Sequence, residues 1–287
     1  ILGGEYKFSI AREKMKIPPL YFAKYPVTNR RYRRFIAYLK GEKSMQTTRM
    51  QLPLEQYSQC LLVSAKQIDG FVEFLGFNPK SWPEKLRSSY DAAKRFNGDS
   101  QPVVGVNWFA AKAYCQWLNE LQRMTSNQQP QTSIFRLPTE AEWEWAASGG
   151  EREYPWGNEK PDGRLANYDH KVGQTTSVDA YPEGTTPEGL MDMAGNAWEW
   201  MDDLYKEGAY QANPRTVRGG SWELPELYIR STSRDGGHPI LDTTLFFGFR
   251  VVIDQLGFIS SISQNRTREL WNASMINEWL YRKGDEQ

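Results

Sequence analysis

The 287-residue chain carries 35 Lys and Arg against 35 Asp and Glu, so its formal net charge at pH 7 is zero. A balanced charge gives no global field that would recruit nucleic acid or an anionic membrane. No run of about 18 apolar residues is present, which excludes a membrane-spanning helix. The 11 Trp, 23 Gly and 16 Pro favour a loop-rich globular fold over a helical bundle. We therefore expect a protein or small-molecule partner, with no nucleic acid and no membrane span.

Cysteine use and the first residues bear on the cellular setting. Cys60 and Cys115 are too few for a disulfide framework, and Cys115 lies in the apolar stretch AYCQWL. Both are predicted to be structural thiols, which favours a reducing compartment such as the cytoplasm. The first residues lack the charged and apolar regions of a signal peptide. Because the chain begins at Ile1 inside a strand-like run, we expect a processed product or part of a longer multidomain chain.

The first hundred residues predict two strand-like runs, 1–10 and 15–27, and then a helix capped by Thr28 or Asn29. One face of that helix is apolar, with Tyr32, Phe35, Ile36 and Leu39. Arginines occupy the opposite face, and such a charge run is typical of a solvated surface. Residues 41–99 hold no repeat and are interpreted as an insertion.

Two further helices are predicted in the middle of the chain. The first follows Asn107 as N-cap and buries the face Ala110, Ala113, Tyr114, Trp117, Leu118 and Leu121. The second begins in FRLPTEAEWEWAASGG, where Thr139 and Glu142 have capping-box spacing. Because Glu140, Glu142 and Glu144 lie within this capping signature, we expect them to have structural and not acid–base roles.

The stretch Gly189–Val252 organises the rest of the chain. It contains GLMDMAGNAWEW, RGGSW and FGFRVV, in which glycines supply tight bends and aromatic residues supply large anchors beside them. The segment between RGGSW and GFR follows neither a helical nor a strand period, so it is predicted to be an irregular loop held at both ends. Beyond Val252, the spacing of the apolar residues predicts an amphipathic helix. Its apolar face would consist of Leu270, Trp271, Met275, Ile276, Trp279 and Leu280.

These three motifs, together with PPLYFAKYPVTN and PVVGVNW, resemble the formylglycine-generating enzyme (sulfatase-modifying factor) family. The resemblance implies an α+β, loop-rich domain with a variant of the C-type lectin fold. The domain is expected over 1–252, with 41–99 as an insertion and 253–287 as a C-terminal helical extension.

Enzymes of that family carry two copper-binding, redox-active cysteines shortly after the GGS-aromatic motif. The matching positions here are Leu224 and Ile229, which can neither bind copper nor form a thiolate. His170 and His238 are too few for a three-histidine iron centre. The sequence therefore predicts no copper, no catalytic residue and a chain that is not an enzyme. An enzyme of the family with altered chemistry stays an alternative.

The resemblance also implies a structural Ca²⁺ site. Asp192 and Glu199 would supply side-chain oxygens, and Gly195 and Ala197 would supply backbone carbonyls. An all-oxygen set of this kind suits a hard cation. The alternative is that Asp192 and Glu199 only satisfy backbone amides in a tight turn.

The same scaffold without its cysteines is known as the variable proteins of diversity-generating retroelements, which display a hypervariable face between RGGSW and GFR. The resemblance implies a non-catalytic ligand-recognition surface, for a protein or a small molecule. The alternative is a sensor or adaptor domain of a larger signalling protein. The predicted ligand-binding residues are Glu223, Leu224, Glu226, Tyr228, Asp235, His238, Ile240, Leu241, Asp242, Thr243, Leu245 and Phe246.

Overall fold

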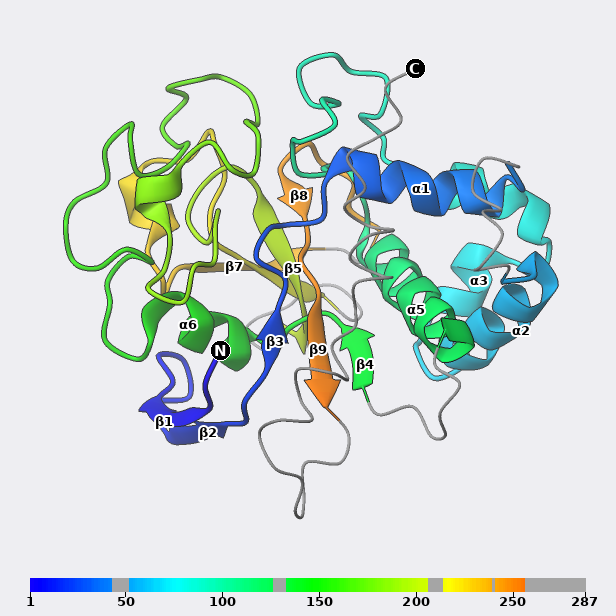
Figure 1. Cartoon of the computed structure of the whole chain (residues 1–287), viewed down its shortest axis with the longest axis horizontal. Coiled ribbons are helices and arrows are strands. Elements are labelled where there is room, and N and C mark those ends of the chain that lie inside the picture. The colour runs from blue at the N-terminus through cyan, green and yellow to red at the C-terminus, as the bar shows by residue number, and fades with distance from the viewer. Residues whose placement is uncertain (43–51, 126–132, 206–213, 239–240, 256–287) are drawn as a thin grey trace.

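The structure is a computed structural model that describes residues 1–42, 52–125, 133–205, 214–238 and 241–255. Short strands and helices are joined by long loops (Figure 1), so the predicted α+β, loop-rich class is confirmed. Of the predicted C-terminal helical extension over 253–287, residues 253–255 belong to a strand, and 256–287 lie outside the described residues.

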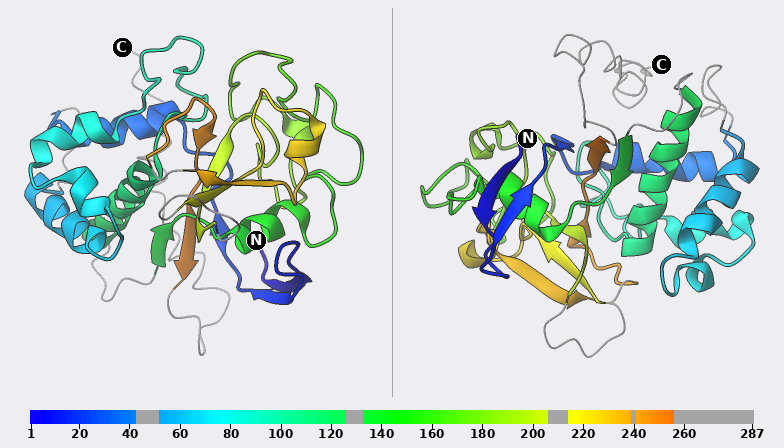
Figure 2. Two further views of the ribbon diagram at one scale, coloured as in Figure 1. Left: turned by 180° about the vertical axis from the view of Figure 1, so that it is seen from behind. Right: turned by 90° about the horizontal axis from the view of Figure 1, so that it is seen from below.

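The helices divide between two sides of the molecule. One side gathers α1, α2, α3 and α5, and the other carries α6 beside the first two strands, as the two views of Figure 2 also show. The helices are α1 (Asn29–Leu39), α2 (Leu54–Ala65), α3 (Phe71–Leu75), α4 (Trp82–Leu86), α5 (Trp108–Thr125) and α6 (Glu140–Ser148).

Three small sheets lie between and beside these helices. The first has the order β1-β2, the second β3-β9-β4, and the third β7-β6-β5-β8. Neighbouring strands are antiparallel except β5 and β8, which are parallel. The strands are β1 (Gly4–Lys7), β2 (Lys14–Ile17), β3 (Tyr21–Phe22), β4 (Ser133–Arg136), β5 (Trp198–Leu204), β6 (Arg215–Arg218), β7 (Arg234–His238), β8 (Phe247–Gly248) and β9 (Val252–Gln255).

Strand β9 joins distant parts of the chain. It pairs with β3 on one edge, in the register Phe22 to Val252, and with β4 on the other, in the register Arg136 to Val252. The beginning, middle and end of the described chain therefore share one sheet. A division into two separately folded halves near Gly150 is excluded.

The predicted helix starts and core faces are confirmed. The Thr28 hydroxyl accepts from the Arg31 amide at 3.4 Å, and the Asn107 side chain accepts from the Ala110 amide at 2.8 Å. Every residue predicted on the apolar faces of α1 and α5 is buried. Their aromatic rings meet in the main core, where Tyr32 and Tyr114 stack at 5.7 Å and both contact Phe249.

The segment 41–99, predicted as an insertion, contributes to that same core. Tyr57, Leu61, Phe71 and Trp82 of α2, α3 and α4 are fully buried in one cluster with the residues of α1 and α5. The Tyr57 hydroxyl donates to the carbonyl of Ala113 on α5 at 2.9 Å. These helices are therefore integral to the domain core. Among the described residues, no helix combines the length and apolar character that crossing a membrane requires.

Candidate functional site

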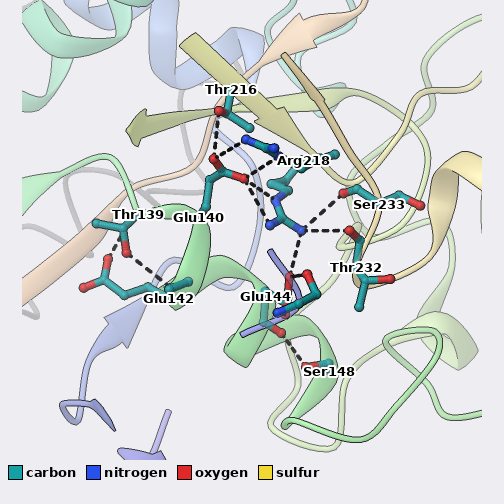
Figure 3. Close-up of polar contacts among 12 residues, drawn as sticks. Thr139, Glu140, Glu142, Glu144, Ser148, Thr216, Arg218, Thr232 and Ser233 are labelled. Carbon is teal, nitrogen blue, oxygen red and sulfur yellow. Dashed lines mark hydrogen bonds and ion pairs between the residues drawn. The ribbon is translucent and has the colours of Figure 1, made fainter. Parts of the chain in front are cut away.

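A buried charge network holds β6 and β7 against α6 (Figure 3). Arg218 is fully buried, and its Nε donates to Glu140 Oε2 at 3.2 Å while its Nη1 donates to Glu144 Oε2 at 3.1 Å. Arg234 on β7 donates to the other Glu140 oxygen at 3.0 Å, and the Thr216 hydroxyl donates to it at 2.9 Å. One helix therefore fixes both β6 and β7.

The capping box predicted at the start of α6 is present. The Thr139 hydroxyl accepts from the Glu142 amide at 3.2 Å, and Glu142 accepts from the Thr139 amide at 2.8 Å. Arg136 also donates two hydrogen bonds of 2.7 Å to the Glu142 carboxylate. The three glutamates of α6 thus have the structural roles that their spacing predicts.

A tight turn precedes β5 and contains the predicted calcium ligands. Gly195 has φ of 74°, and a Cβ at this position would lie 2.3 Å from the Asn167 carbonyl oxygen, so only glycine fits. The Gly195 carbonyl accepts from the Ala197 amide at 2.8 Å. Asn196 donates to Asp192 Oδ2 at 2.8 Å. Burial raises the pKa of Asp192 to about 7, and the Asn196 hydrogen bond and Arg250 oppose that shift.

Glu199 lies on β5, directly after this turn, and its carboxylate already accepts several hydrogen bonds. Its Oε1 accepts from Arg250 at 2.6 Å, and its Oε2 accepts from Arg250 at 2.7 Å and from Trp143 at 2.8 Å. The Arg250 guanidinium thus provides the positive charge that the carboxylate needs. A calcium ion bound here would share Glu199 with this arginine, and calcium binding stays a prediction. Across the described residues, no three His, Cys, Asp or Glu side chains gather as metal ligands.

The segment between Trp222 and Phe247 presents both exposed and half-buried side chains. Leu227, Tyr228 and Leu241 are 59%, 41% and 52% exposed. Asp235 is also exposed, while Glu223, Glu226, Asp242 and Thr243 are half-buried. We name these eight side chains the 223–247 face. His238 contributes its backbone to β7 opposite Arg215, and Ile240 lies outside the described residues.

Other predicted ligand residues pack inward instead. Leu224 and Phe246 pack against the main core, and Leu245 and Phe246 pack against the small cluster around Trp222. The Phe246 and Trp222 ring centroids are 5.9 Å apart. The irregular hydrophobic pattern could not separate these side chains from the exposed ones. These contacts attach the segment to the domain.

A loop that was not predicted to take part lies against the start of the face. The amides of Asp169 and His170 donate to the carbonyls of Leu224 and Trp222, both at 2.9 Å. The His170 ring meets the Trp222 ring edge-on at 5.5 Å. Burial raises the pKa of Glu223, and His170 opposes this shift. Both Asp169 and His170 have φ near 55°, and no sequence signal distinguishes them from ordinary loop residues.

The positions that match the family's copper cysteines are structural here. Leu224 packs on the core, and Ile229 is fully buried against Tyr154, Ala166 and Tyr168. Cys115 is buried in α5, where burial raises the pKa of its thiol to about 12. Neither cysteine belongs to the 223–247 face.

Comparison with known proteins identifies relatives over most of the chain. The family model for the sulfatase-modifying factor enzyme 1-like domain matches residues 1–255. The inactive C-alpha-formylglycine-generating enzyme 2 of Mus musculus is 28% identical over 276 residues, covering 90% of this chain and 80% of that protein. Hercynine oxygenase of Mycolicibacterium smegmatis is 30% identical over 200 residues, covering 61% of this chain. The chain spans only 43% of that oxygenase.

One solved structure, CarF, shares the overall fold. CarF superposes with a TM-score of 0.51 at 20% identity, covering 87% of this chain and 95% of that chain. Treponema denticola variable protein 1 superposes with a TM-score of 0.43 at 25% identity, covering 63% of this chain and 79% of that one. The predicted formylglycine-generating-enzyme type of fold is confirmed.

The expectation that the chain is not an enzyme is contradicted by these relatives. It rested on the missing copper cysteines and on the small number of histidines. Hercynine oxygenases are enzymes by name and share the matched region with this chain. Loss of one reaction of a family therefore does not exclude another.

Proposed function

Because the chain belongs to the sulfatase-modifying factor enzyme 1-like family, we propose that it binds a ligand on the 223–247 face. The observation that carries the proposal is the exposure of Leu227, Tyr228 and Leu241 on a segment whose two ends are buried. Exposed apolar side chains on a fixed base are typical of interaction surfaces.

The base of this face is rigid at both ends. Arg218 and Arg250 are fully buried, and each is paired with a carboxylate of another element. Gly220 has φ of 77°, and a Cβ there would lie 2.7 Å from the Tyr228 carbonyl oxygen. The backbone at Tyr228 therefore packs directly against the backbone at Gly220. Within the segment, the Ser233 hydroxyl donates to the Leu227 carbonyl at 2.7 Å. A preorganised surface loses less conformational entropy when a ligand binds.

The charge of the face indicates the chemistry of its ligand. Glu223, Glu226, Asp235 and Asp242 supply carboxylates beside the apolar side chains. The two arginines of the segment are paired with carboxylates outside it, Arg230 with Glu153 and Arg234 with Glu140. We therefore propose a ligand with an apolar group and a cationic or hydrogen-bond-donating group. A peptide with basic and aromatic residues fits this description.

A direct test uses a random peptide library displayed on phage and selected on the folded chain. Tyr228→Ala and Leu241→Ala should each weaken the selected peptides by at least about fivefold, since anchor residues contribute more than about 1 kcal/mol. Phe77→Ala is the matched control, because Phe77 is 77% exposed but lies outside the face. Peptides that bind all three variants equally well would refute the proposal.

The hercynine oxygenases among the relatives favour a second candidate, binding of a small-molecule substrate. Hercynine itself is the probe to titrate by calorimetry against the wild-type chain, Tyr228→Ala and Glu223→Gln. Saturable binding that both variants weaken would assign a substrate to the 223–247 face. Absence of binding would reject this second candidate and leave the peptide experiment to decide the first.

A further inference from the structure

A separate cavity of about 220 Å³ lies between α1 and the residues that follow α4. Arg33 and Ile36 of α1 and the following Lys40 line one side, and Arg87, Asp91 and Val103 line the other. None of the lining residues belongs to the 223–247 face, so a ligand in this cavity would be independent of the proposed function. The volume is below the roughly 300–1,000 Å³ of pockets for drug-sized ligands, which favours a small ligand.

Hydrogen bonds between buried groups hold the two walls in place. The Ser88 hydroxyl donates to the Val104 carbonyl at 2.6 Å, and the Asn29 side chain donates to the Phe96 carbonyl at 2.8 Å. The Tyr32 hydroxyl donates to the carbonyl of Leu86 across the same junction. The cavity is therefore formed before any ligand arrives.

The side chains that line the cavity include three cations, Arg33, Lys40 and Arg87, and two carboxylates, Glu42 and Asp91. Arg33 donates to Asp91 at 2.7 Å and to Asp99 at 2.6 Å. Arg87 pairs through Nε, at 2.8 Å, with Glu84, which is not among the lining residues. Lys40 and Glu42 have no ion pair with another described residue. Beside the pair of Arg33 with Asp91, the lining thus holds two cations, Lys40 and Arg87, and one carboxylate, Glu42.

We propose that this cavity binds a small oxyanion, a phosphate or a carboxylate, between Lys40 and Arg87. A guanidinium offers two parallel donors to such a group, and a lysine adds a compact charge from the opposite side. The side chains of Ile36 and Val103 supply an apolar wall for a short carbon stem. Glu42 limits the negative charge that the cavity accepts, so a ligand with one or two charges fits better than a polyanion.

The experiment titrates inorganic phosphate and, separately, succinate into the full chain by calorimetry, at constant ionic strength with chloride as reference. Saturable binding of either anion is expected, and the two arms distinguish phosphate from carboxylate ligands. Lys40→Gln and Arg87→Gln should each weaken the binding by at least fivefold. Arg164→Gln is the matched control, since Arg164 is an exposed arginine paired with Asp162 and lies outside the cavity.

Two results would overturn the proposal: no saturable binding of either anion, or binding that Lys40→Gln and Arg87→Gln leave unchanged. Both side chains are exposed, so these substitutions should leave the core intact. If a variant fails to fold, amide chemical shifts of the wild-type chain decide the question. Added phosphate or succinate should shift the signals of α1 and of residues 87–91, and shifts confined to other regions would refute the site.

Discussion

Glu140 neutralises two arginines at once, because Arg218 and Arg234 both donate to its buried carboxylate. Glu140→Gln would leave these guanidinium groups with one carboxylate fewer in a region closed to water. Breaking a buried ion pair in this way typically costs about 3–5 kcal/mol. We expect a loss of that size in the free energy of unfolding measured with urea. Glu159→Gln, which changes an exposed carboxylate 3.9 Å from Arg164, should change it by less than about 0.5 kcal/mol.

The two thiols should differ in reactivity. Only the thiolate reacts with iodoacetamide, and the pKa of Cys115 is about 12, so almost none of it is ionised at pH 8. Cys60 is half-buried beside Arg123 and reachable by solvent. Peptide mapping by mass spectrometry should find the native chain alkylated at Cys60 first and at Cys115 only after denaturant is added. Equal labelling in the native state would show that α5 opens readily.

Sequence reasoning at this scale identified residue types but not their partners. The capping spacing of Thr139 and Glu142 correctly predicted that the neighbouring glutamates are structural. It could not predict that Glu140 meets Arg218, because residues 78 positions apart become neighbours only when β6 packs on α6. Likewise, Trp222 was predicted as an anchor, but the contact of His170 with it depends on a loop path that has no periodic signal.

At the scale of elements, substitutions between Trp222 and Phe249 should fall into two groups. Those of buried residues should lower stability, and those of exposed residues should leave stability almost unchanged. Phe249 is fully buried in the main core, and its replacement by Ala should cost about 3–5 kcal/mol. Leu227→Ala and Leu241→Ala remove exposed side chains and should change stability by less than about 0.5 kcal/mol. Thermal unfolding followed by circular dichroism measures both. Equal destabilisation by all three would place the exposed leucines in the core.

In this comparison of stability, Phe246 should behave like the buried Phe249 and not like the exposed leucines. Phe246 is among the ligand-binding residues predicted from the sequence. In the structure it packs between two clusters and meets Trp222, so Phe246→Ala should be measurably destabilising.

The calcium prediction concerns the turn before β5. If calcium binds there, a chelator should lower the melting temperature, because an ion that binds only the folded state stabilises it. Asp192→Asn is the informative variant, since it removes a ligand but spares the buried pair of Glu199 with Arg250. It should abolish the response to chelator. If chelator leaves the melting temperature of the wild-type chain unchanged, calcium does not bind at the turn, and Glu199 serves to pair with Arg250.

The helices were easier to predict than the sheets. Thr28 and Asn107 caps followed by apolar faces locate α1 and α5 closely, since both signals are local. Strand pairing is not local: the parallel contact of Trp198 with Phe247 and the two-sided pairing of Val252 join residues far apart in the chain. For these, only the family resemblance gave guidance.

For the molecule as a whole, the helices of segment 52–86 should unfold together with the rest. Trp82 and Tyr57 are buried in the same cluster as Tyr114, and no separate core serves them among the described residues. Hydrogen exchange at low denaturant should therefore give the slowest amides of α2 and α5 the same opening free energy. A markedly lower value for α2 would show that the segment unfolds as a unit of its own, as its interpretation as an insertion suggests.

The central place of β9 also constrains how the chain can fold during synthesis. At roughly 5–20 residues per second, some 10–50 s separate the emergence of β3 from that of β9 at the ribosome. Until β9 emerges, β3 and β4 lack the strand that joins them. Glu199 likewise has no Arg250 to pair with until the same stage of synthesis. The nascent chain must therefore keep many aromatic side chains from aggregating until almost all of the matched domain has been made, which makes it a natural client for chaperones that bind growing chains.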